Sequence, residues 1–201
     1  MQLLGINKQH ALYFLILIAC THCCSAANAR STAICDSTKH EDLVLCAESR
    51  YKESDSELNT IYRRAVTSLN RDTTDQLRST QRQWILFRDA QCGPRGNTED
   101  FGAEAPIERL ICLSSLTKDR VGEIKRILGS KESSAYYTVI NSLLKSGFGS
   151  SPSEIRNRLA ETSNEDPLWN DYVDQNCEIM NRISGEDIID CKARMNLFRT
   201  D

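Results

Sequence analysis

Histidine is scarce in this sequence, and the shortage argues against several kinds of catalytic site. The 201 residues include three histidines, and only His40 follows the first 29 residues. The chain also has no G-x-S-x-G segment and no glycine-rich loop of the phosphate-binding kind. General acid–base and nucleophilic catalysis most often use histidine or an activated nucleophile of this type. The composition therefore favours a protein that is not an enzyme and that needs no cofactor.

The apolar run near the start of the chain is too short to cross a bilayer. It spans residues 11–19 and follows Lys8, whereas a transmembrane helix needs about 20 residues. These features are typical of a secretory signal, so we expect residues 1–29 to be a signal segment. The Ala-Asn-Ala at residues 27–29 suits cleavage before Arg30, while Leu-Ile-Ala-Cys at 17–20 resembles a lipobox that would place a lipid on Cys20. Both alternatives stay open, and both predict export to the periplasm or cell envelope.

The sequence also lacks a cluster of basic residues. Lys8 is the only charged residue in the expected signal, so 24 of the 25 basic residues remain against 28 acidic ones. This mild acidity argues against a nucleic-acid partner. It is compatible with a cationic protein partner without requiring one.

Six of the nine cysteines follow the expected signal: Cys35, Cys46, Cys92, Cys112, Cys177 and Cys191. An even number of cysteines in an exported chain favours disulfides. Their spacings form no C-x2-C pair, and only one histidine is present to assist them, so a zinc site is not expected.

Two segments of the chain share one skeleton of tryptophan, cysteine and arginine. In each segment a tryptophan precedes a cysteine by eight positions, and a second cysteine precedes an arginine by eight. The positions are Trp84, Cys92, Cys112 and Arg120 in the first segment, and Trp169, Cys177, Cys191 and Arg199 in the second. Phe87 and Asp89 then align with Tyr172 and Asp174. The agreement of two spacings indicates a diverged tandem repeat.

The repeat selects one disulfide scheme from the 15 that six cysteines allow. The second segment holds only Cys177 and Cys191, so we expect these two to pair. Their counterparts Cys92 and Cys112 then pair as well, which leaves Cys35 for Cys46.

Apolar residues recur at helical intervals, and no segment alternates with the period of a strand, which predicts an all-α fold of disulfide-stapled helical hairpins. We expect a helical domain at residues 30–130 and a diverged helical half-repeat at 134–201. A turn centred near residues 71 and 72 would bring Asp55 opposite Arg88. We therefore predict an Asp55–Arg88 ion pair that fixes helix register, with Asn59 and Gln81 as neighbouring hydrogen-bond partners.

The ordered positions of residues 35–128 resemble the LprI-type lysozyme-inhibitor family. The resemblance includes Cys35 and Cys46, Asp55-x-x-Leu-Asn59, Gln81-x-x-Trp84-x-x-Phe-Arg88-Asp-x-x-Cys92, and Cys112 with Arg120. The resemblance implies a small exported helical domain that inhibits lysozyme. Residues 134–201 depart from the pattern, with no clear counterparts there of Asn59, Gln81 and Arg88.

The resemblance favours an envelope protein that blocks lysozyme or a related peptidoglycan hydrolase. Loops on a rigid scaffold commonly carry binding residues, so the candidate surface is the loop at residues 93–106, with Arg95, Asn97, Glu99 and Asp100. The alternative is an immunity protein or adaptor that binds another secreted effector. In either case the partner is a protein, and the membrane is involved only through a lipid anchor.

Overall fold

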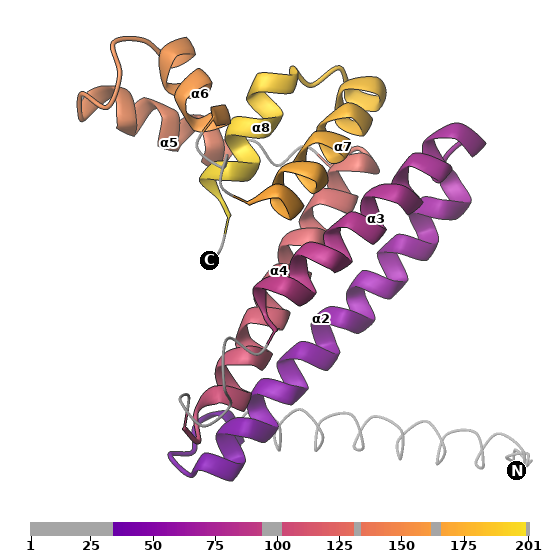
Figure 1. Cartoon of the computed structure of the whole chain (residues 1–201), viewed down its shortest axis with the longest axis vertical. Helices are drawn as coiled ribbons and strands as arrows, with labels where there is room; N and C mark the ends of the chain where they lie inside the picture. The colour runs from indigo at the N-terminus through magenta and orange to yellow at the C-terminus, as the bar shows by residue number, and fades with distance from the viewer. Residues whose placement is uncertain (1–33, 94–101, 131–133, 162–165, 200–201) are drawn as a thin grey trace, which may run out of the picture. The chain divides into compact units, whose positions relative to one another are not determined.

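The structure is a computed structural model, and it describes residues 34–93, 102–130, 134–161 and 166–199. Every regular element in these ranges is a helix, which confirms the all-α prediction. The helices, shown in Figure 1, are α2 (His40–Ser68), α3 (Arg71–Gln91), α4 (Ala105–Ile127), α5 (Ser134–Lys145), α6 (Pro152–Glu161), α7 (Pro167–Ser184) and α8 (Ile188–Leu197).

The chain divides into two compact units, one ending at Ser49 and the other beginning at Arg50. In the first unit a disulfide joins Cys35 to Cys46, with their Cα atoms 5.1 Å apart. The Ser37 hydroxyl donates to the Asp42 carboxylate at 2.6 Å. The residues just before α2 are therefore tied to its first two turns.

Polar side chains begin the helices of the second unit at defined residues. The Asn70 side chain accepts a hydrogen bond from the Thr73 amide at 3.0 Å and begins α3. Asp166 does the same for α7, where Pro167 takes the first helical position. Gly185 ends α7 with φ of 70°, a left-handed conformation that glycine adopts without strain.

The core of the second unit contains residues from both halves of the repeat. Helix α7 packs against α3, α4 and α8. The main cluster of buried residues accordingly joins Trp84 and Phe87 of α3 to Trp169, Tyr172 and Cys177 of α7. A smaller cluster, built on Tyr136, Ile140, Ile155, Leu159 and Ala193, joins α5 and α6 to α8. We expected a short polar linker at residues 131–134; residues 131–133 lie outside the described residues, and Ser134 already begins α5. The division into two domains stays a prediction.

The two tryptophans provide a test of this shared core, because the chain has no others. Trp84→Phe leaves Trp169 as the reporter, and Trp169→Phe leaves Trp84. In each variant we expect tryptophan fluorescence and far-UV circular dichroism to follow the same urea transition, since both rings lie in one cluster. Midpoints that differ by about 1 M urea between the two probes would instead show that the halves unfold separately.

Candidate functional site

The four named residues of the predicted binding loop and the predicted lipid site lie outside the described residues, and the last two positions of the predicted loop, Ala105 and Pro106, belong to α4. Arg95, Asn97, Glu99 and Asp100 fall within 94–101, and Cys20 falls within 1–33. The anchoring of the loop is described, however. A disulfide joins Cys92, at the end of α3, to Cys112 of α4, with Cα atoms 5.7 Å apart. The two ends of the segment between these cysteines are therefore joined by a covalent bond between α3 and α4.

Leu86 and Ile111 are the most exposed of the large apolar side chains on the two helices that this bridge joins. Leu86 of α3 is 53% exposed and Ile111 of α4 is 55% exposed. Single exposed apolar residues are normal on protein surfaces. These two nevertheless add apolar contact area to the pair of helices that carries the loop.

The predicted Asp55–Arg88 ion pair is wrong. The Asp55 carboxylate accepts from the Asn59 side chain at 2.9 Å. Arg88 binds its neighbour Asp89 at 2.7 Å and lies over the Trp84 ring. The prediction placed the turn near residues 71 and 72, but α2 ends at Ser68 and α3 begins at Arg71. This earlier turn shifts the facing positions by about one helical turn and separates the two charges.

Gln81 instead contacts Arg120, whose side chain is fully buried. Arg120 Nε donates to Gln81 Oε1 at 2.9 Å, and Nη1 donates to the side-chain oxygens of Asn176 at 2.8 Å and Tyr172 at 3.3 Å. Arg120 therefore links α3 and α4 of the first half to α7 of the second.

A second buried arginine, Arg194 of α8, continues this polar network. It is 3% exposed and binds the carboxylates of both Glu123 and Glu186. Glu123 also accepts from Asn176 at 3.0 Å, which connects Arg194 to the partners of Arg120. Burial alone would lower the pKa of Arg194, but the charge of Glu123 and the hydrogen bonds to both carboxylates outweigh burial and raise it.

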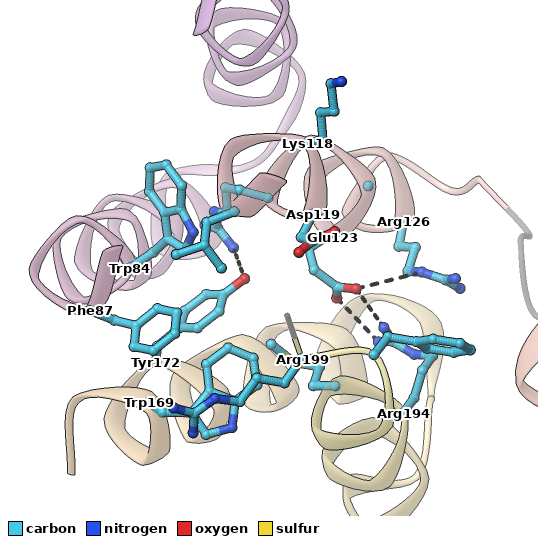
Figure 2. A pocket seen from close by; sticks show the side chains of 15 residues that line it. Trp84, Phe87, Lys118, Asp119, Glu123, Arg126, Trp169, Tyr172, Arg194 and Arg199 are labelled. Atoms are coloured by element: carbon cyan, nitrogen blue, oxygen red, sulfur yellow. Dashed lines mark hydrogen bonds and ion pairs between the residues drawn. The ribbon is translucent and has the colours of Figure 1, made fainter. Parts of the chain in front are cut away.

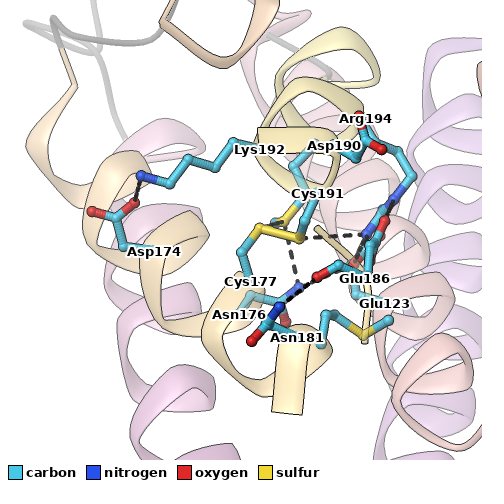
Figure 3. Close-up of a disulfide and its surroundings, with 12 residues drawn as sticks. Glu123, Asp174, Asn176, Cys177, Asn181, Glu186, Asp190, Cys191, Lys192 and Arg194 are labelled. Atoms are coloured by element: carbon cyan, nitrogen blue, oxygen red, sulfur yellow. Dashed lines mark hydrogen bonds and ion pairs between the residues drawn. A yellow bond between two sulfur atoms is a disulfide. The ribbon is translucent and has the colours of Figure 1, made fainter. Parts of the chain in front are cut away.

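The disulfide Cys177–Cys191 lies beside this network, as Figure 3 shows. Its Cα atoms are 5.6 Å apart, and both cysteines are fully buried. All three predicted cysteine pairs are thus joined in the structure.

The repeat extends to a polar contact that the sequence pattern did not reveal. When Trp84 is aligned with Trp169, Gln81 and Asp166 occupy the same position, three residues before the tryptophan. Asp166 binds Arg199 at 2.9 Å, as Gln81 binds Arg120 at 2.9 Å. Gln81 therefore has a counterpart in the second half, contrary to the prediction. Because an amide is replaced by a carboxylate, residue identity gave no sign of it.

The closing arginine of each half of the repeat lies over an aromatic ring of the other half. Arg120 lies over the ring of Tyr172, 5.2 Å from its centroid, and Arg199 lies over the ring of Phe87 at 5.4 Å. Phe87 and Tyr172 are themselves counterparts, and their rings stack with centroids 6.4 Å apart. Reciprocal contacts between equivalent positions are the mark of an approximate two-fold relation.

Burial raises the pKa of Tyr172 to about 12, although the charge of Arg120 lowers it in part. Unfolded tyrosine ionises near pH 10, so between pH 10 and 12 the unfolded chain loses a proton that the folded chain retains, and stability falls as pH rises. At pH 11 this difference amounts to about 1.4 kcal/mol. Between pH 9 and 11, we expect the free energy of unfolding of the wild type to fall by about 1.4 kcal/mol more than that of Tyr172→Phe, as measured by urea unfolding. Parallel curves for the two proteins would contradict this.

A cavity of about 210 Å³ opens where the two halves of the repeat meet in the second unit. Figure 2 shows aromatic side chains on one side of it and charged side chains on the other. The aromatic residues are Trp84, Phe87, Trp169 and Tyr172, and the charged residues opposite them include Glu123, Arg126 and Arg194. Sequence reasoning found the aromatic positions through the repeat, but not Glu123, Asn176 or Arg194.

Two kinds of site are absent from the part of the chain that the structure describes. Its His, Cys, Asp and Glu side chains form no group of three that could hold a metal ion. None of its helices is long and apolar enough to span a membrane.

The fold and its bridges define a small all-α protein stapled by three disulfides. Residues 35–124 match the family model described as lysozyme inhibitor LprI. An uncharacterized protein of Rhizobium meliloti (strain 1021) is 32% identical over 128 residues, which cover 55% of this chain and 91% of that protein. The chain belongs to the LprI family. No solved structure matches it.

Membership in this family and the three disulfides indicate an extracytoplasmic protein.

Proposed function

We propose that this protein inhibits lysozyme or a related peptidoglycan hydrolase in the bacterial periplasm or cell envelope. The observation that supports this most directly is the match of residues 35–124 to the lysozyme-inhibitor family. The matched range contains the segment between Cys92 and Cys112, whose ends the disulfide holds together. A bridged loop of this kind suits an inhibitor, because less conformational freedom is lost when it binds.

Lysozyme cleaves its substrate with two carboxyl groups that flank the scissile bond in a cleft. An inhibitor needs only to occupy that cleft, and a cationic side chain would complement the carboxylates. Arg95 is the basic residue of the predicted binding loop. We therefore assign Arg95 as the main electrostatic contact, with Asn97 as a hydrogen-bonding neighbour.

The test is a cell-wall turbidity assay with lysozymes of several classes. We expect the oxidised mature protein to slow clearing at micromolar concentration. Arg95→Ala should weaken inhibition about tenfold, equivalent to about 1.4 kcal/mol. The matched control is Arg78→Ala, which removes an exposed arginine of α3 paired with Asp75 and should leave inhibition within about twofold. Unslowed clearing with every lysozyme would refute the proposal.

One observation favours a second candidate, an immunity protein or adaptor for another secreted effector. The family match ends at residue 124, so α5 to α8 lie beyond it. These helices have their own bridge and expose large apolar side chains such as Tyr137, which is 51% exposed. Affinity capture from a periplasmic extract would discriminate the two functions, because a single partner without hydrolase activity would support this candidate.

The mode of attachment to the envelope is a separate part of the proposal. A mature chain that begins at Arg30 would be free in the periplasm, whereas a lipid on Cys20 would hold it at a membrane. Mass spectrometry of the mature N-terminus distinguishes the two forms by the presence of the acyl chains.

A further inference from the structure

The three disulfides differ in their exposure to solvent. In each of the first two bridges one cysteine is partly exposed, Cys35 in the first and Cys112 in the second. In the third bridge Cys177 and Cys191 are both 0% exposed and belong to the main buried cluster. A disulfide is reduced when a thiolate attacks one of its sulfur atoms, so the rate depends on access to that sulfur. Solvent access therefore separates the third bridge from the other two.

Two side chains of α8 cover the third bridge. The Met195 sulfur lies 3.8 Å from the Cys177 sulfur, and Met195 is itself only 5% exposed. Met195 also lines the cavity between the two halves of the repeat, whereas Cys177 does not. At the other sulfur, Arg194 Nη2 lies 3.7 Å from Cys191 Sγ, as Figure 3 shows. Met195 therefore separates the Cys177 sulfur from the cavity.

The charge beside this bridge acts in the opposite direction to burial. Reduction releases one sulfur as a thiolate, and the guanidinium of Arg194 would stabilise a thiolate at Cys191. Exchange is faster when the leaving thiolate is stabilised, so Arg194 alone would favour reduction of this bridge. That effect changes the rate by a graded factor, whereas a sulfur that no thiolate can reach does not react in the folded state at all. We therefore expect burial to decide.

We propose that a dithiol reductant opens the bridges Cys35–Cys46 and Cys92–Cys112 in the folded protein, and opens Cys177–Cys191 only after local unfolding. This order follows from burial and does not depend on the proposed function. A reducing environment would act first on the half of the chain that contains the predicted binding loop. The fold thus holds two redox-sensitive bridges and one that resists reduction.

Reduction of the second bridge consumes one dithiol. Its first thiolate attacks the Cys112 sulfur, the bond between Cys112 and Cys92 breaks, and Cys92 leaves as a thiolate that takes up a proton from water. The second thiolate of the reductant then attacks the mixed disulfide and releases Cys112 as a thiolate, which is protonated in the same way. The protein disulfide gains two electrons, and the reductant becomes a disulfide. The first bridge reacts likewise through Cys35.

The test is the initial rate at which dithiothreitol reduces each bridge of the oxidised mature protein. Free cysteines are alkylated at short times, before a second bridge opens, and are assigned by peptide mass spectrometry. We expect Cys177–Cys191 to react at least about a hundredfold more slowly than Cys92–Cys112, because only a small locally unfolded fraction exposes it. Urea below the unfolding midpoint should raise the rate of Cys177–Cys191, since unfolding exposes the bridge, and should leave the other two rates nearly constant. Comparable rates for all three bridges, or a rate of Cys177–Cys191 that does not depend on urea, would overturn the proposal.

Met195→Ala tests the cover over the Cys177 sulfur. The shorter side chain no longer separates this sulfur from the cavity, so Cys177–Cys191 should react at least about tenfold faster and with little dependence on urea. The matched control is Met180→Ala, because Met180 is 4% exposed in the same cluster but does not line the cavity. It destabilises the core without opening this path, so its Cys177–Cys191 rate should still rise with urea as in the wild type.

The same urea dependence in Met195→Ala and Met180→Ala would overturn the assignment of Met195 as the cover. The urea series on the wild type decides the proposal if Met195→Ala fails to fold.

Discussion

Arg194→Met is expected to lower the free energy of unfolding by about 3–5 kcal/mol. Arg194 is almost fully buried and binds the carboxylates of Glu123 and Glu186. Methionine fills much of the same volume but leaves Glu186 without its cation and leaves Glu123 with only the longer ion pair to Arg126, at 3.7 Å. The expected loss arises mainly from those stranded charges and less from the value of the ion pairs themselves. Urea unfolding at pH 7 measures it.

Lys192→Met on the same helix is the matched control. Lys192 pairs with Asp174 at 2.6 Å, and both side chains are partly exposed. An ion pair of that kind contributes about 0–1 kcal/mol. Combining Arg194→Met with Glu123→Gln and Glu186→Gln should recover part of the loss, since the stranded charges are removed. Equal effects of Arg194→Met and Lys192→Met would contradict our account.

Replacing Cys92 and Cys112 together by alanine is expected to cost about 3 kcal/mol of stability. The bridge closes a segment of 20 residues, and loop-closure entropy of the unfolded chain predicts a loss of this size. Under the proposed function, inhibition of lysozyme should also weaken, because the ends of the binding loop are no longer joined. Urea unfolding and the turbidity assay measure the two effects.

The pair Cys177→Ala and Cys191→Ala separates stability from inhibition. That bridge closes 14 residues, so its removal should also cost about 3 kcal/mol. It lies in the other half of the repeat and should leave inhibition unchanged at temperatures where the protein stays folded. Equal loss of inhibition in both double variants would show that the loop has no special role.

The sequence was most informative where spacing is repeated. The matched distances between tryptophan, cysteine and arginine predicted all three cysteine pairs, since a duplicated helical hairpin repeats its covalent constraints. Those distances also identified Arg120, although its burial was not predicted. Helical periodicity was sufficient for the all-α fold, and local signals add to it where they occur, as Asn70 at the start of α3 and Gly185 at the end of α7 illustrate.

Contacts that depend on the exact facing of two helices were not predictable. The prediction of an Asp55–Arg88 pair failed because Asn70 already begins α3, so the turn lies before residues 71 and 72, and the resulting shift of about one helical turn separates the charges. Arg194 and Glu123 lie 71 residues apart, and neither belongs to the repeated skeleton. In the sequence alone, nothing distinguishes either residue from an ordinary charged residue on the surface of a helix. Only the packing of α8 and α7 against the first half brings them together.

The reciprocal stacking of Arg120 on Tyr172 and Arg199 on Phe87 relates the two halves as a homodimer relates its subunits. In a true homodimer one codon sets both sides of the interface, and the association weakens on dilution. Here the halves are covalently linked, so they stay together at any protein concentration, and each side can mutate alone. Phe87 and Tyr172 record that freedom: the hydroxyl that accepts from Arg120 exists on one side only.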